Sequence, residues 1–539
     1  MNKFKLYITI AAVSVLASCS KSFLDTKDVT TGSEENFYKT PADAFKALTG
    51  VYAGLKTAVS NGGGIVSMSE VMSDNAFGAT GNGDGWGWTM VDEFNKLRSP
   101  ADMDMYSGPW ADYYKAIYRA NMLLKNIGQV NWSGTADASN AYIAETRFIR
   151  AYCYFDLVRL FGNIPLLTAP SADNIPQAGA DSVYNLIAQD LKYAIDNLSA
   201  ISYPSQDKAT YGRATKWAAE ALMARVYLYY TGYYGKPDLA GVITKADALK
   251  YTEDVIANSG HGLVDNFANL WPAASLDNYA GENNKETVFG VKYTFTGDYN
   301  GNTDGNQWMV MFGIRYGVNS QITPYGQGWG GATVNPRLWN AYSLVDSVRQ
   351  KATIISIAGE ELPKGGSVSD IQKDQREYTG YYWKKYTPMS DAAGKSLAEK
   401  LGSPSFQIGQ YQDYVAIRYA DVLLMAAELG SANAQADFDA VRKRALGAGF
   451  VQTPVSQAGI MAERRLEFAG EGIRYWDLLR QGVDAAASTI AETTTLLNGG
   501  APATVTIAAD NIKATKGLSQ IPNNQISLSN GVLKQNAGW

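Results

Sequence analysis

From Pro109 to Ala257 the sequence is a succession of amphipathic helices, and this run limits the possible folds more than any other feature. In each segment apolar residues recur every three or four positions, as in a helix with one buried side. Segment 139–161 is apolar on two adjoining sides, so we expect it to be buried among other helices. The expected helices start at Pro109, at Ser139, at Asp181 or Ser182, close to Trp217 and, through a Thr-x-x-Asp capping box, after Thr244.

Further helices are expected on either side of this run. Pro41 suits the first position of a helix that continues to about residue 59. Helical patterns return at 417–429 and in the run AQADFDAVRKRAL. The sequence therefore predicts a mainly α protein.

Two stretches lack helical periodicity. Stretch 61–98 contains GATGNGDGWGW, which is rich in glycine and predicts a loop. Stretch 263–410 is rich in Gly, Asn, Tyr and Trp, with strand-like alternation at 287–295. We therefore expect an irregular, loop-rich part that contains only small strands.

The stretch Ala462–Gln481, AERRLEFAGEGIRYWDLLRQ, combines helical spacing with many charges. Gly470 and Gly472 interrupt the pattern, so it predicts two helical pieces joined at Gly-Glu-Gly.

The charges of this stretch allow two interpretations. Glu463, Glu467 and Glu471 are spaced four apart, as in a carboxylate cluster for acid–base or metal chemistry. Alternatively the carboxylates are neutralised by arginines one turn away. That alternative pairs Arg464 with Glu467, and Arg474 with Glu471 and Asp477. We favour a structural ion network, because a catalytic cluster needs carboxylates that are left free.

The N-terminus has the pattern of an export signal. Lys3 and Lys5 precede the apolar run Leu6–Leu16, which is too short for a membrane-spanning helix. Leu-Ala-Ser before Cys19 resembles a bacterial lipobox, which predicts a signal peptide at 1–18 and an acylated Cys19 as membrane anchor. Cys153 is the other cysteine, so we expect no disulfide.

Composition argues against several classes of function. Lys+Arg is 47 and Asp+Glu is 52, a mildly acidic balance that does not favour nucleic acid. The single histidine, His261, lies between two glycines, and neither H-E-x-x-H nor G-x-S-x-G nor a P-loop occurs. A pair of carboxylates could still form a glycosidase, so that alternative stays open.

Several segments resemble the SusD/RagB family of surface lipoproteins, which capture nutrients, usually glycans, for an outer-membrane transporter. They are ERRLEFAGEGIRYWDLLRQG, AETRFIRAYCYFDLVRLFGNIPL, YGRATKWAAEALMARVYLYY and the closing QNAGW, in which Ala537 stands where the family usually has proline. The resemblance implies a TPR-like helical array with an irregular, loop-rich ligand-binding face.

The resemblance also implies an organisation and a location. We expect a SusD-like N-terminal region at 19–260 and a C-terminal region at 261–539. The latter comprises a loop-rich segment (261–410), helices with the signature (411–485) and a tail. The mature protein is expected to be lipid-anchored in the outer membrane and to face the cell surface, with a TonB-dependent SusC-like transporter as partner.

Candidate ligand contacts come from tryptophans in glycine-rich segments. Trp86 and Trp88 have almost no apolar neighbours in sequence, so they either fold back as a plug or form a contact surface. An indole can cover the C–H side of a sugar ring, and planar polar side chains can bind the hydroxyls. In the family, loops from these segments form the ligand site. The predicted ligand-binding residues are Trp86, Trp88, Trp308, Trp329, Asp74, Asn75, Asp84, Asn306 and Gln307.

The run DYNGNTDGN resembles part of a calcium loop. Its oxygen ligands would be Asp298, Asn300, Asn302 and Asp304. Position twelve is Met309, however, which breaks the EF-hand pattern, so a turn-rich loop is the default and no cofactor is expected.

The resemblance thus implies non-catalytic capture of an oligosaccharide at the cell surface and its delivery to the transporter. Two alternatives remain: a peptide-capturing member of the same family and a lipid-anchored glycosidase.

Overall fold

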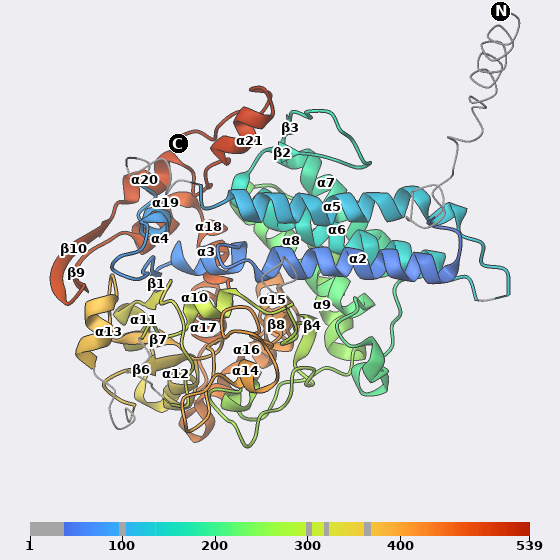
Figure 1. Ribbon diagram of the computed structural model, residues 1–539. Helices are drawn as coiled ribbons and strands as arrows, with labels where there is room; N and C mark the ends of the chain where they lie inside the picture. The colour runs from blue at the N-terminus through green and yellow to red at the C-terminus, as the bar shows by residue number, and fades with distance from the viewer. Residues whose placement is uncertain are drawn as a thin grey trace, which may run out of the picture.

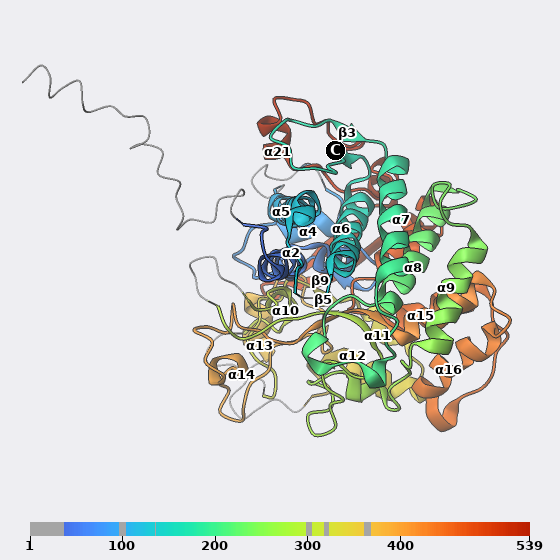
Figure 2. The same cartoon turned by 90° about the vertical axis from the view of Figure 1, so that its right-hand side faces the viewer.

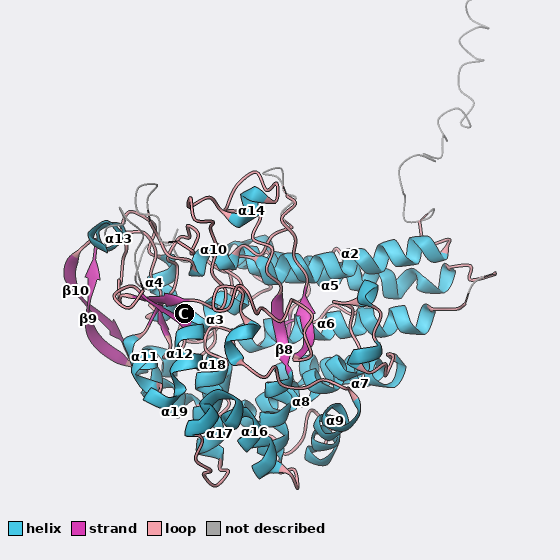
Figure 3. Cartoon of the chain, turned by 90° about the horizontal axis from the view of Figure 1, so that it is seen from below, coloured by secondary structure: helices cyan, strands magenta, loops and turns pink. Residues whose placement is uncertain are grey.

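The computed structural model describes residues 37–95, 97, 104–134, 136–297, 304–316, 323–360 and 368–539. The predicted signal peptide, Cys19 and the calcium candidates Asp298, Asn300 and Asn302 lie outside these residues. Helices dominate the described chain, and the strands are short (Figure 1, Figure 3). The prediction of a mainly α protein is confirmed.

The framework is an array in which each helix packs against the next (Figure 2). It begins with α2 and ends with two helices from the C-terminal part of the chain, so the array unites both parts. The predicted TPR-like array is confirmed. Its members are α2 (Pro41–Ser60), α5 (Ser107–Asn126), α6 (Ser139–Phe161), α7 (Ala180–Asn197), α8 (Lys216–Tyr234), α9 (Lys245–Asn258), α15 (Tyr419–Leu429) and α16 (Ala434–Leu446).

Local sequence explains the helix boundaries. Capping boxes start α2 and α9: Thr40 and Asp43 exchange hydrogen bonds at one, and Thr244 and Asp247 do so at the other. Helix α6 has the predicted bounds, and from Ala144 onward every residue except Arg147 is buried. Its two apolar sides therefore contact helices on both flanks.

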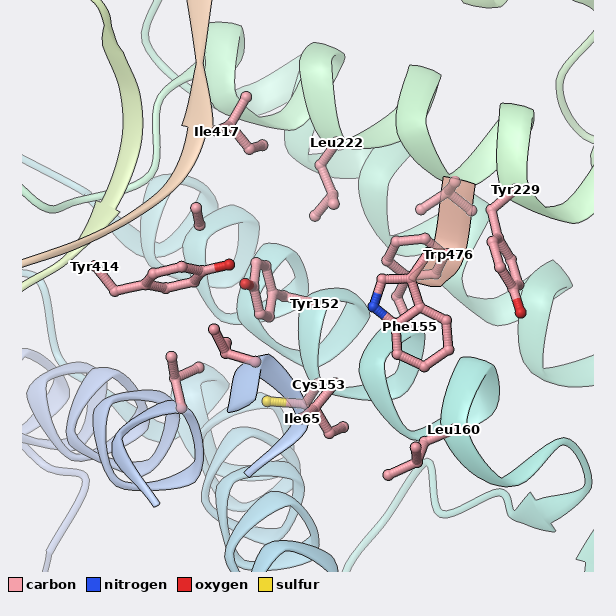
Figure 4. Packing of buried hydrophobic residues seen from close by; sticks show 14 of the residues in the cluster. Ile65, Tyr152, Cys153, Phe155, Leu160, Leu222, Tyr229, Tyr414, Ile417 and Trp476 are labelled. Carbon is pink, nitrogen blue, oxygen red and sulfur yellow. The ribbon is translucent and has the colours of Figure 1, made fainter. Parts of the chain in front are cut away.

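The main hydrophobic core joins segments from both ends of the chain. Figure 4 shows Tyr152 and Phe155 of α6 among Leu222 of α8, Tyr414 and Trp476. Tyr414 comes from a strand and Trp476 from the C-terminal signature, so this core holds the signature against the array.

Strands pair only two by two within the described residues. The predicted strand at 287–295 is present but shorter, as β4 (Thr287–Val291), and it runs antiparallel to β8 (Tyr414–Arg418). The other antiparallel pairs are β1 (Ala76–Phe77) with β5 (Thr333–Val334), β2 (Ile164–Pro165) with β3 (Gln177–Ala178), β6 (Ile354–Ser356) with β7 (Tyr381–Trp383), and β9 (Glu492–Asn498) with β10 (Ala501–Ile507).

The prediction of a plain loop at 61–98 is wrong. Two short helices occur there, α3 (Ile65–Val71) and α4 (Gly87–Asp92), and residues 64–81 are all buried. The apolar residues of IVSMSEVM lie between the glycines and enter the main core. The glycine-rich sequence marks the two ends of this segment, but the apolar residues between them form buried structure.

The remaining helices are short. They are α10 (Trp308–Phe312), α11 (Pro336–Ala341), α12 (Ser347–Thr353), α13 (Val368–Asp374), α14 (Leu397–Lys400), α17 (Gln457–Glu467), α18 (Arg474–Leu479), α19 (Val483–Ile490), α20 (Ala509–Ala514) and α21 (Asn523–Leu528). Helices α17 and α18 are the two predicted pieces of the signature. Gly470 and Gly472 between them have φ of +80° and +74°, which glycine adopts without strain.

Candidate ligand-binding site

The charges of the signature form a buried ion network, as predicted, but the predicted local pairs are wrong. Arg464 binds Asp421 and Asp477, and Arg474 binds Asp74. Asp477 lies within the signature, whereas Asp421 and Asp74 come from other parts of the chain, so the network ties the signature to the rest of the fold.

Glu467 is the centre of this network. It accepts hydrogen bonds from Arg349 (3.0 Å), Arg418 (2.7 Å) and Arg444. Burial alone would raise the pKa of Glu467, but the guanidinium groups of Arg444, Arg418 and Arg349 outweigh it and hold the pKa below its ordinary value. A carboxylate held in the charged form by three cations serves structure and leaves no free base.

Glu70 of α3 anchors the Gly-Glu-Gly turn. Its Oε1 accepts hydrogen bonds from the backbone N–H groups of Gly470 and Gly472, both at 2.9 Å. Burial raises the pKa of Glu70 to about 7, although these hydrogen bonds oppose the rise. Sequence reasoning missed this contact, because the two partners are separated by 400 residues.

Several predicted ligand contacts are buried in the structure, so the expectation that they are exposed is wrong. Trp308 has 0% of its surface exposed and packs against the rings of Phe312, Tyr386 and Tyr414. Trp88 is buried within α4. Both indoles contribute to the core and offer no surface to a ligand.

Three of the predicted polar ligand contacts are also buried. Asp74 is an ion-pair partner of Arg474 and Arg465, at 2.7 and 3.0 Å. Asn75 accepts a hydrogen bond from Arg465 at 3.0 Å, and Asn306 donates one to the backbone of Gln412. All three are buried, because they complete interactions between distant segments. Gln307 is half-buried at the start of α10.

Trp86, Asp84 and Trp329 remain at the surface, and the structure brings them together around Arg315. Both tryptophans are 37% exposed. The Arg315 guanidinium donates to Asp84 Oδ2 at 2.9 Å and, through Nε, to Asp374 Oδ2 at 2.8 Å. Its backbone forms a bridge with Gly328, the residue before Trp329. We call Trp86, Asp84, Arg315, Trp329 and Asp374 the aromatic patch.

The loop that carries Trp86 is built on a second arginine. Arg376 is buried, and it donates hydrogen bonds to the backbone oxygens of Gly85 (2.9 Å) and Asp84 (2.8 Å). Its guanidinium lies 3.9 Å from the centre of the Trp86 ring, within cation–π range. The Arg376 guanidinium therefore covers one side of the Trp86 indole. Helices α4, α10 and α13, which flank these loops, lie at one end of the molecule (Figure 1).

Gly81 is required where this loop passes Arg315. A Cβ at position 81 would lie 2.1 Å from the Arg315 Cζ atom, which is closer than any real contact. The absence of a side chain therefore allows Arg315 to reach Asp84. Arg315, Arg376 and Asp374 were missed by sequence reasoning, since no local pattern connects them to the tryptophans.

The patch combines the groups that a neutral sugar needs. Indole rings can cover the C–H groups of a pyranose, while carboxylate and guanidinium groups bind hydroxyls through charge-assisted hydrogen bonds. Both carboxylates of the patch are already engaged by the same arginine.

The candidate metal ligand and the histidine that the sequence singled out can be placed in the described residues. Within them, no three or more His, Cys, Asp or Glu side chains are grouped so that they could hold a metal ion. Asp304, the one calcium candidate inside the described ranges, binds Lys56 and accepts a hydrogen bond from Thr296 at 3.0 Å. His261 lies in a loop, as predicted, with Nδ1 3.0 Å from the Lys285 backbone oxygen.

None of the helices in the described part of the chain combines the length and the apolar character needed to cross a membrane.

Comparison with known proteins agrees with this architecture. A family profile described as starch-binding, associating with the outer membrane, matches residues 22–228, and the profile of the SusD family matches residues 356–539. The chain is 27% identical to a SusD-like protein of Bacteroides ovatus over 494 residues, which cover 88% of this chain and 82% of that protein.

Two solved structures are similar over nearly the whole chain. One is a laminarin-binding SusD-like protein, with 28% identity and a TM-score of 0.73. The other is surface glycan-binding protein A from Bacteroides fluxus, with 25% identity and a TM-score of 0.73. Each alignment covers 93% of this chain and 100% of the other. The chain therefore belongs to the SusD/RagB family.

Proposed function

We propose that this protein captures a glycan at the aromatic patch, without cleaving it, and delivers it to a TonB-dependent SusC-like transporter. The observation that carries the proposal is the position of Trp86 and Trp329, which are partly exposed on two loops that both contact Arg315. Two partly exposed indoles on neighbouring loops can offer their rings to a sugar.

The relatives support a glycan as the ligand. The similar solved structures include proteins named as laminarin-binding and as surface glycan-binding. Laminarin is therefore the first polysaccharide to test, within a panel that also contains other glucans and mannans. A ligand found in this way identifies the substrate class directly.

The experiment compares tryptophan variants with a matched aromatic control. Trp86→Ala and Trp329→Ala should each weaken glycan binding by roughly 1 kcal/mol or more, the value of an aromatic contact at a binding site. Tyr118 of α5 is half-exposed and lies outside the patch, so Tyr118→Ala should bind as the wild type does. Unchanged affinity in both tryptophan variants would show that the ligand binds elsewhere.

The two alternatives have distinct outcomes. A peptide-capturing protein would bind members of a peptide library and none of the glycans. A glycosidase would release reducing ends from a polysaccharide, and we expect none from the purified protein. Both carboxylates of the patch are held by Arg315, so neither is placed as a free acid or nucleophile.

Anchoring and delivery are tested separately. Acylation of Cys19 would hold the protein on the outer membrane, and Cys19→Ala should release it into the soluble fraction.

Delivery requires contact with the transporter, so the tagged protein should co-purify with a SusC-like barrel from solubilised membranes. Glycan binding should persist in EDTA, since we assign no metal to the patch.

A further inference from the structure

A cavity lies apart from the aromatic patch and shares no lining residue with it. It has a volume of about 360 Å³, is open to solvent on one side, and is lined by α2, the loop 209–213 and residues 289–292 in and after β4. Small-molecule sites in proteins commonly have volumes in this range. Helix α2 and β4 pack beside each other (Figure 1), and no residue of the aromatic patch lines the cavity.

Aromatic rings form much of the wall. Phe45, Tyr52, Tyr211 and Phe289 all line the cavity, and Phe45 is half-exposed. The Tyr52 hydroxyl is already engaged, because it donates to Glu145 Oε2 at 2.6 Å and accepts from the Ala214 N–H at 2.8 Å. Tyr52 therefore contributes mainly its ring to the wall.

Two cations line the same cavity, and their carboxylate partners are buried. The side chain of Arg213 is 33% exposed and that of its partner Glu145 is 4% exposed. For Lys292 and Asp413 the values are 39% and 3%. Both cations line the cavity and neither carboxylate does, so the cationic ends of the two pairs are the accessible ends.

The two cations occupy one wall. Gly212, next to Arg213, approaches Lys292 so closely that a Cβ there would lie 2.4 Å from Lys292 Cγ. Lys56 adds a third positive charge to the lining and is paired with Asp304. Among the described residues that line the cavity, none is an aspartate or a glutamate.

We propose that this cavity is a second ligand site and that it binds an anionic sugar, such as a uronic acid residue. The rings of Phe45 and Tyr211 suit the C–H side of a pyranose, and Arg213 and Lys292 suit its carboxylate through charge-assisted hydrogen bonds. The hydroxyls of a neutral sugar can accept hydrogen bonds from the two cations, but they bring no negative charge to them. Charge therefore selects the ligand here, whereas the aromatic patch presents carboxylates as well as a guanidinium.

The test measures binding of D-glucuronate and of D-glucose to the full mature chain by saturation-transfer NMR titration. The two sugars differ only at C6, so the comparison isolates the carboxylate. Glucuronate should bind saturably and roughly tenfold or more tightly than glucose, and added salt should weaken it. Absence of saturable glucuronate binding, or equal affinity for the two sugars, overturns the proposal.

Variants locate the binding without disturbing the buried ion pairs. Phe45→Ala removes a half-exposed ring and should weaken glucuronate binding roughly fivefold or more. Trp86→Ala should leave glucuronate binding unchanged, which separates this site from the aromatic patch. Glucuronate binding that survives Phe45→Ala and is lost in Trp86→Ala places the acidic sugar at the patch and overturns the second site. Loss of neutral-glycan binding in Trp86→Ala, by contrast, tests the proposed function of the aromatic patch and not the second site.

Discussion

Glu70→Gln tests how the signature is anchored to the N-terminal part of the chain. In the wild type, Glu70 Oε1 accepts two backbone hydrogen bonds from the Gly-Glu-Gly turn, while Oε2 is buried and has no hydrogen-bond partner among the described residues. Glutamine keeps the accepting oxygen and cannot ionise. The substitution therefore removes the titration while it preserves the two hydrogen bonds.

The magnitude follows from the pKa. Burial raises the pKa of Glu70 from 4.5 to about 7 in the folded protein. The folded state thus binds the proton more tightly than the unfolded state, so this group's stabilising contribution is complete below pH 4.5 and is lost as the pH rises to 7. One pKa unit corresponds to about 1.36 kcal/mol, so the loss amounts to about 3 kcal/mol.

The assay is urea unfolding, followed by tryptophan fluorescence at pH 4, 6 and 8. The stability of Glu70→Gln relative to wild type should improve by about 3 kcal/mol between pH 4 and pH 8. Any cost of the new amide is present at every pH and cancels in this difference. Glu399→Gln, on α14, should follow the wild-type profile. Parallel pH profiles for Glu70→Gln and wild type would refute the burial argument.

Three further substitutions test the network, the turn and the patch. Glu467→Ala leaves buried guanidinium groups without their shared carboxylate and should cost about 3–5 kcal/mol in urea unfolding; a loss below about 1 kcal/mol would contradict the network. Gly470→Ala forces a side chain to φ +80° with its Cβ 2.8 Å from the Trp383 ring, so stability should fall by about 1–3 kcal/mol, and unchanged unfolding would exclude strain at this turn. Gly81→Ala should displace Arg315 and weaken glycan binding by about 1 kcal/mol, with little change in the unfolding midpoint; equal affinity would mean that Arg315 does not organise the patch.

The helical framework could be predicted because its signals are local. Helix α6 begins and ends where the apolar spacing and the following glycine place it, and the capping box of α9 needs only Thr244 and Asp247. These patterns act within one or two turns of chain. The hairpin of β9 and β10 also has a local signal, which the sequence reasoning did not use: Gly499 and Gly500 both have positive φ between two threonine-rich strands.

The candidate site could be predicted only in part, because exposure depends on distant partners. Trp86 and Trp308 both follow glycine- and asparagine-rich sequence, yet Trp308 is enclosed by Tyr386 and Tyr414, which lie later in the chain. Arg315 was missed for the same reason, since its partner Asp84 precedes it by 231 residues. Whether Trp86 and Trp329 bind ligand, and whether the regions divide near residue 260, stay predictions.

Affinity electrophoresis against a polysaccharide panel that includes laminarin tests the central claim most directly. We predict that at least one polysaccharide slows the migration of the wild type and of Tyr118→Ala, and that Trp86→Ala combined with Trp329→Ala abolishes this retardation. If the double variant is retarded as strongly as the wild type, or if no polysaccharide slows the wild type, glycan capture at the aromatic patch is contradicted.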